Sequence, residues 1–105
     1  MTTTNPTDAR QFKPGDILDA TFHYSAQIPK FYVVTRNTGK TIYAEEIGKR
    51  TVSCDRYGQN GQVVPDPEKR TGEIESARIR KGNYIRLNDS YTKIWDGRPV
   101  DFYTD

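Results

Sequence analysis

His23 and Cys54 are the only histidine and the only cysteine of the chain, so they are the first candidates for metal or nucleophile chemistry. A zinc site needs several Cys or His ligands at paired spacings, and two isolated residues do not supply them. No spacing rule links the two as a nucleophilic pair either. We therefore predict no metal site and no cofactor. A lone cysteine of this kind is typically a small, half-buried side chain.

The carboxylates do not form a catalytic pair. Glu45 and Glu46 are adjacent in a strand-like segment, where neighbouring side chains point to opposite faces. The aspartates most relevant to such chemistry are scattered, at Asp16, Asp19, Asp55 and Asp96. The segment Gly58-Gln59-Asn60-Gly61 lacks the Lys-Ser/Thr pair and the following helix of a phosphate loop. We expect a protein that is not an enzyme and has no catalytic residues.

A basic hairpin near the C-terminus carries the strongest binding signal. From Glu68 to Arg86 the chain has six Lys or Arg against three Glu. Strand alternation predicts one core face, formed by Ala77, Ile79, Ile85 and Leu87. The opposite face then carries Arg78, Arg80, Tyr84 and Arg86, joined by Tyr91, Lys93 and Trp95 if Ile94 points inward. Cations interleaved with aromatic rings are typical of surfaces that bind single-stranded nucleic acid.

A second interpretation of the same residues stays open. Arg and Lys on a strand face also protect sheet edges from aggregation and pair with glutamates across strands. Glu73 and Glu75 are close enough in sequence to neutralise part of the charge. A slip of one residue in strand register would bury Trp95 and expose Ile94.

The elements that must position these residues are strands. Alternating or β-branched runs, separated by turn residues, occur at residues 17–24, 31–36, 41–47, 49–57, 62–64, 76–80, 84–87 and 91–95. The turn at residues 37–40 predicts the clearest hairpin, with Gly39 free to adopt a positive φ. Pro65 and Pro67 are predicted to end regular pairing. We expect an all-β single domain of roughly six to eight short strands, a partly open barrel of the SH3-like or OB-like kind.

Length and composition set the organisation. A chain of 105 residues forms one domain. Residues 1–11 lack bulky aliphatic side chains and are predicted to be a flexible leader before a β domain spanning residues 12–105. The start lacks the pattern of a secretion signal, and no apolar run reaches the length of a membrane span. With one cysteine and a net charge of +2, these features lead us to expect a cytoplasmic protein that does not contact membranes.

Several short motifs together resemble a known family. They are Phe31-Tyr32-Val33-Val34, Gly39-Lys40-Thr41-Ile42, Glu46-Ile47, Val63-Val64-Pro65 and Trp95-Asp96-Gly97-Arg98-Pro99. In this order they resemble the FYQV, GKT, REI, VVP and YKWDGRP segments of a family of small uncharacterised proteins from bacteriophages and other mobile elements. The resemblance spans residues 16–99, and the C-terminal motif is its most specific part. It departs from the family at Lys93-Ile94-Trp95 and in the last residues. It implies a mobile-element setting in a bacterial host and no mechanism.

Two classes of function follow. The first is a small binding module that contacts nucleic acid through the basic and aromatic face. The second is a protein-binding inhibitor of a host defence nuclease or another host enzyme, of the anti-CRISPR kind, which would use exposed aromatics. Its candidate interface residues are Tyr24, Phe31, Tyr32 and Tyr43. A virion or assembly component is a third possibility, and the oligomeric state stays open.

Overall fold

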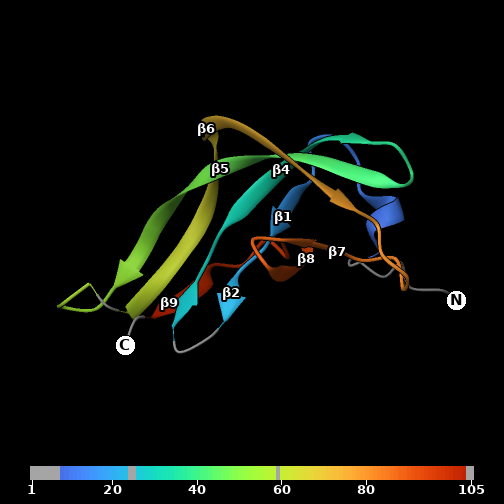
Figure 1. Cartoon of the computed structure of the whole chain (residues 1–105). Coiled ribbons are helices and arrows are strands. Elements are labelled where there is room, and N and C mark those ends of the chain that lie inside the picture. Colours follow the sequence, from blue (N-terminus) through green and yellow to red (C-terminus); the bar gives the residue numbers. More distant parts are fainter. Residues whose placement is uncertain (1–7, 24–25, 59, 104–105) are drawn as a thin grey trace, which may run out of the picture.

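The computed structural model describes residues 8–23, 26–58 and 60–103 (Figure 1). These residues form one short 3-10 turn, η1 (Ala9–Gln11), and a single nine-stranded antiparallel sheet. The strands are β1 (Ile17–Asp19), β2 (Phe22–His23), β3 (Gln27–Ile28), β4 (Phe31–Asn37), β5 (Thr41–Cys54), β6 (Asn60–Arg78), β7 (Ile85–Leu87), β8 (Ser90–Ile94) and β9 (Val100–Tyr103). The described part contains no helix with the length and hydropathy needed to span a membrane. The all-β prediction is confirmed.

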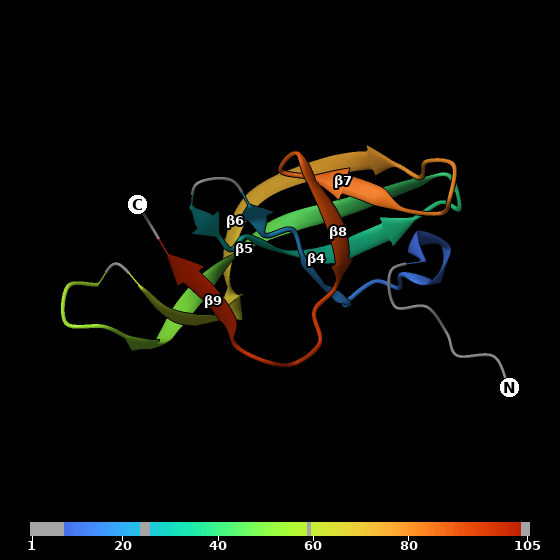
Figure 2. The same ribbon diagram turned by 90° about the horizontal axis from the view of Figure 1, so that it is seen from below.

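The strands lie in the order β2-β3-β9-β6-β5-β4-β1-β8-β7. After β6 the chain turns back and forms β7, which is the edge strand at one end of this order. β7 therefore lies beside the C-terminal part of β6 (Figure 2). Among the described residues, one isolated bridge, from Arg80 to Tyr84, joins the two sides of this turn outside the strands. The sheet therefore curls strongly but stays open. Its nine strands exceed the predicted six to eight, because two very short strands and the C-terminal segment also pair.

Two strands are much longer than the sequence pattern suggested. β5 has 14 residues and β6 has 19, and they form one long bent hairpin that reaches both halves of the sheet (Figure 1). The prediction that Pro65 ends the pairing is wrong, since Pro65 pairs with Lys49, whereas Pro67 has no partner in the register with β5. The register instead jumps at this place, from Gly48 opposite Asp66 to Ile47 opposite Arg70. β9 pairs with β6 only as far as Val63, and β6 is free on that side at the prolines, where a missing N–H is tolerated.

The hairpin of β4 and β5 has the predicted turn, with Gly39 at a φ of 87°. β4 is buried on both faces, because its first four residues contribute alternately to two apolar clusters. The inner cluster contains Leu18, Tyr32, Val34, Ile42, Ala44, Ala77, Ile85 and Leu87, with Ala9, Phe12 and Ala20. The outer cluster contains Phe31, Val33, Ile47 and Val63, with Ile17, Trp95, Val100 and Phe102 packed against it. A four-residue apolar run is the signature of such a doubly covered strand.

The N-terminal boundary differs from the prediction. Residues 1–7 of the predicted leader lie outside the described residues. Residues 8–11 belong to the folded domain, since Ala9 is fully buried in the inner cluster. The backbone N–H of Ala9 donates to the carbonyl of Asn83 at 2.8 Å, and the Asn37 amide donates to the carbonyl of Phe12 at 2.8 Å. These hydrogen bonds stabilise a segment that has almost no apolar surface of its own.

Candidate nucleic-acid interface

Two tight turns hold β7 and β8 in place. Asn88 and Asp89 connect Leu87 to Ser90 and have φ values of 55° and 51°, the left-handed pair of a type I′ hairpin. The turn before β7 uses Gly82 and Asn83 at positive φ. Both turns are therefore fixed by residue types that accept this conformation at low cost.

The inner face of this hairpin anchors it to the core. Ile85, Leu87 and Thr92 are buried, and the Thr92 hydroxyl accepts a hydrogen bond from the Leu87 N–H at 2.9 Å. The predicted core side chains Ala77, Ile85 and Leu87 are buried, and Ile79 packs against them. The inward alternation predicted from the sequence is confirmed for these four residues.

The outer face gathers the predicted basic and aromatic residues. Arg86 lies directly opposite Tyr91, and Arg80 bridges to Tyr84, so each pair shares one side of the sheet. Arg78, Arg80, Arg86, Tyr91 and Lys93 are exposed, whereas Tyr84 is half-buried. We call Arg78, Arg80, Tyr84, Arg86, Tyr91 and Lys93 the basic face.

Two tyrosine rings form its aromatic centre. Tyr84 and Tyr91 stack with their centroids 5.5 Å apart and an interplanar angle of 27°. Tyr91 remains 50% exposed, so the pair is packed on itself while one ring stays open to solvent. A ring fixed in this way can accept a base without a large loss of side-chain entropy.

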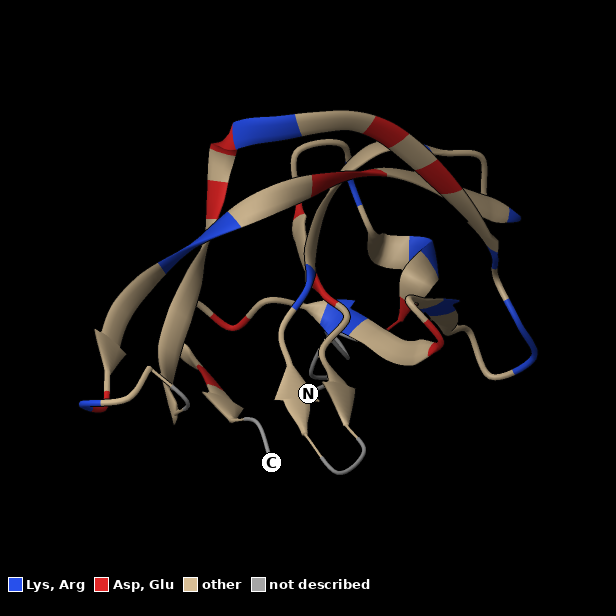
Figure 3. Ribbon diagram, turned by 60° about the vertical axis from the view of Figure 1, so that its left-hand side comes forward, with Lys and Arg blue, Asp and Glu red and all other residues tan. Residues whose placement is uncertain are grey.

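The cations around the tyrosines have no acidic partners. Among the described residues, no carboxylate oxygen lies within 4.0 Å of Arg78, Arg80, Lys81, Arg86 or Lys93. Glu73 and Glu75, which could have neutralised part of this charge, form no ion pair among the described residues, and Glu45 and Glu46 of β5 pair with Arg70 at 3.3 Å and Lys30 at 3.5 Å. Figure 3 shows Lys and Arg along the turn after β6, whereas the upper course of β6 carries both blue and red segments. The Arg86 guanidinium donates to the Asp89 carbonyl at 2.8 Å, which orients its charge.

The structure does not place Trp95 on the basic face. Its indole lies at 72° to the Phe31 ring with centroids 6.4 Å apart, in the outer cluster. The indole N–H donates to the Arg98 carbonyl at 2.7 Å, and Asp96 accepts from the Arg98 N–H at 2.9 Å. Gly97 completes this turn with a φ of 86°. The C-terminal motif thus folds back and covers the sheet, which corrects the prediction that Trp95 lies on the outer face with Tyr91 and Lys93.

Two of the four aromatics proposed for a protein interface are inaccessible. Phe31 and Tyr32 are fully buried, so that part of the prediction is wrong, because both faces of β4 are covered. Tyr43 is half-buried beneath the Arg36 guanidinium, 5.8 Å from its ring centroid. Tyr24 lies outside the described residues. Burial and the nearby Glu75 carboxylate raise the pKa of Tyr32 well above its usual range.

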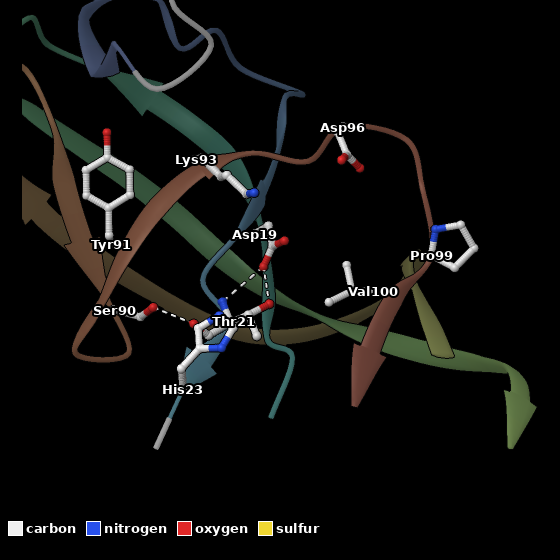
Figure 4. Close-up of a pocket in the computed structure, with 9 residues that line it drawn as sticks. All are labelled: Asp19, Thr21, His23, Ser90, Tyr91, Lys93, Asp96, Pro99 and Val100. Atoms are coloured by element: carbon white, nitrogen blue, oxygen red, sulfur yellow. Dashed lines mark hydrogen bonds between the residues drawn. The ribbon is translucent and has the colours of Figure 1, made fainter. Parts of the chain in front are cut away.

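A cleft beside Tyr91 was not predicted. It has a volume of about 390 Å³ and lies between β8, the end of β1 and the turn that follows Trp95 (Figure 4). Asp19, Thr21 and Lys93 line it, together with Ser90 and Asp96. Asp19 and Thr21 are both buried, although they are polar. The sequence offered no signal for this, because the segments that form the cleft are far apart in the chain.

His23 lies on β2 and is exposed, and Cys54 is exposed at the end of β5. Cys54 is therefore more open than the half-buried position predicted. Within the described ranges, no group of three or more His, Cys, Asp or Glu side chains is placed to hold a metal ion.

No protein-family model, curated protein or solved structure matches this chain. The resemblance to mobile-element proteins therefore stays an expectation from the sequence motifs.

Proposed function

We propose that the protein is a non-enzymatic module that binds single-stranded nucleic acid on the basic face. The observation that carries this proposal is the stacked Tyr84–Tyr91 pair, open on the Tyr91 side and surrounded by cations without carboxylate partners. Unpaired charges next to an exposed ring are what a strand of phosphates and unstacked bases requires.

The residues would divide the work. Arg78, Arg80 and Arg86 would contact phosphates, because guanidinium groups bind them with directed hydrogen bonds. Tyr91 would stack on a base, and Tyr84 would support its ring from the other side. Phosphate contacts would supply most of the affinity and make it sensitive to salt, whereas stacking would be tolerant of sequence.

The curled sheet supports this proposal as a scaffold. We include in the proposal a partly open barrel of the SH3-like or OB-like kind, supported by the inner cluster inside the curl and by the bridge from Arg80 to Tyr84. Open barrels of this type present a sheet face to single strands. The proposed setting is the cytoplasm of a bacterial host, as part of a bacteriophage or mobile element, and it rests on the motif resemblance and the lone cysteine.

The test is a titration of fluorescein-labelled dT12 by anisotropy at several salt concentrations. We expect binding that weakens with salt, and a double variant, Arg80→Gln with Arg86→Gln, that lowers the log–log salt slope by about 1.4. A matched control replaces two exposed arginines far from the basic face in the chain, Arg50 on β5 and Arg56 in the turn between β5 and β6. The double variant Arg50→Gln with Arg56→Gln should leave the salt slope nearly unchanged.

Equal effects of the two double variants would contradict the assignment of the basic face. Absence of dT12 binding at low salt would contradict the function itself. The inhibitor hypothesis would then become the leading one, although the burial of Phe31 and Tyr32 means that it needs a different surface.

A further inference from the structure

The cleft beside Tyr91 contains a buried carboxylate with one oxygen unused. Asp19 is 7% exposed, and its Oδ1 accepts hydrogen bonds from the Thr21 N–H, at 3.0 Å, and from the Thr21 hydroxyl. Its other oxygen has no hydrogen-bond partner among the described residues and points into the cleft (Figure 4). Ser90 donates to the Thr21 carbonyl at 2.5 Å and fixes this segment against β8. The carboxylate is therefore held in one orientation before any ligand arrives.

The other charged groups of the cleft are Lys93 and Asp96. Lys93 lies directly opposite Asp19 in the pairing of β1 with β8, and its side chain extends over the cleft without an ion pair within 4.0 Å. Asp96 uses Oδ1 for the Arg98 N–H, so its second oxygen has no described partner. The charged groups of the cleft thus offer two carboxylate oxygens as acceptors and one ammonium group as donor, and the His23 imidazole also lines the cleft and adds one ring N–H and one ring acceptor.

This arrangement disfavours an anion. Two carboxylates against one ammonium give the cleft a negative balance, so a phosphate would be repelled there while it is attracted to the arginines nearby. A neutral group with more donors than acceptors fits instead. A polar ring is also favoured, because Tyr91 borders both the cleft and the basic face.

We propose that the cleft binds a guanine base of the single strand held on the basic face. Guanine presents two donors, N1–H and the N2 amino group, and one acceptor, O6, on its Watson–Crick edge. Cytosine and adenine have one amino group there, and thymine has one N–H between two carbonyls. Asp19 and Asp96 accept from the guanine donors, and Lys93 donates to O6. This inference rests on the proposed function, since Tyr91 and the arginines deliver the strand.

The experiment compares dT12 with oligonucleotides in which one central position is guanine, hypoxanthine, adenine or cytosine. We expect the single guanine to tighten binding by roughly tenfold over thymine, and hypoxanthine, which lacks the N2 amino group, to recover only part of this. This series uses the unmodified protein, so it does not depend on the folding of any variant.

A pair of variants locates the effect. Asp19→Asn keeps an oxygen for Thr21 but loses the anionic acceptor, and should abolish the guanine preference while dT12 binding and its salt slope persist. Asp89→Asn removes the same charge from the adjacent turn and should preserve the preference. Thermal unfolding of each variant confirms that it is folded.

Salt-dependent binding of dT12 with no guanine preference would overturn the cleft assignment and leave the proposed function in place. Loss of the preference in both variants, or its survival in Asp19→Asn, would also overturn it. If none of the oligonucleotides binds, the proposed function itself fails.

Discussion

Two strand regions of this molecule are both rich in aromatic residues, but one exposes its aromatic rings and the other buries them. On the hairpin of β7 and β8, Tyr84 and Tyr91 stack on each other at an open surface among unpaired cations. On β4, Phe31 is enclosed by Trp95 and the side chains of β9. Both regions are strands rich in aromatic residues. The difference is that a segment from the far end of the chain covers one and not the other.

The comparison shows what separates a binding surface from a core in a small β protein. The outer cluster exists because the C-terminal motif turns back and places Trp95 and β9 over the sheet. No described element covers the basic face in the same way, and its cations form no ion pair with a described carboxylate. An aromatic residue there contributes little burial and is available to a ligand.

Trp95 provides the largest test of this contrast. Trp95→Ala should lower the free energy of unfolding by about 3 kcal/mol, because it removes a ring packed on Phe31 and leaves a cavity. Chemical denaturation measures the change, with Tyr57→Ala as the control, since Tyr57 is 77% exposed on the β5–β6 turn. An unchanged stability together with a large loss of oligonucleotide affinity would mean that Trp95 belongs to the binding surface after all.

Ala9 tests whether the N-terminal turn η1 packs against the inner cluster. Ala9→Asp places a carboxylate in the inner cluster and should cost about 2 kcal/mol of stability, because a buried charge there has no partner. Gln11→Asp adds the same charge at an exposed position of η1 and should have little effect in the same denaturation experiment. Equal stabilities for the two variants would contradict the packing of η1 against the core.

Tyr91 tests whether an aromatic ring of the basic face contributes to binding and not to stability. Tyr91→Ala should weaken binding of dT12 by about 1–3 kcal/mol through the loss of stacking, with nearly unchanged stability. Anisotropy and thermal unfolding together separate the two effects, and Tyr103→Ala is the control, since that ring is exposed on β9. A stability loss as large as that of Trp95→Ala would make Tyr91 a core residue.

Tyr32 gives the smallest expected effect. Its hydroxyl is buried without a hydrogen-bond partner among the described groups, so Tyr32→Phe should change stability at neutral pH by less than about 1 kcal/mol. Its raised pKa keeps the folded state protonated where the unfolded chain ionises. Stability is therefore fully present below about pH 10 and falls above it, and the variant should fall less steeply. An identical alkaline loss in both proteins, measured by denaturation across pH, would contradict the burial of this hydroxyl.

Much of the fold could be predicted from local patterns. Alternation and turn residues identified the hairpin around Gly39 and the inward set of Ala77, Ile85 and Leu87, because both depend on neighbours in sequence. The pattern of the basic face was predicted on the same ground. The four-residue apolar run that begins at Phe31 is typical of a strand covered on both faces, but we assigned its aromatics to an exposed interface, and the structure shows that they are buried.

The remainder depends on contacts between distant segments. Strand alternation shows which side chains share a face but not whether another segment covers that face, so Trp95 and the pairing of β9 could not be derived. The cleft at Asp19 likewise forms where β1, β8 and the turn after Trp95 meet. Pro65 shows the converse, since a residue that breaks a central ladder is tolerated where β6 has a neighbour on one side only.

The most direct test of the central claim is a backbone NMR titration of the protein with dT12 at low salt. We expect the largest amide shift changes at Arg80, Tyr84, Arg86, Tyr91 and Lys93. Val52, near the end of β5, and Tyr57, in the turn between β5 and β6, should change little. Shift changes confined to the end of β5 and the turn that follows it, or no shift changes at any concentration of dT12, would contradict the assignment of the basic face as a nucleic-acid surface.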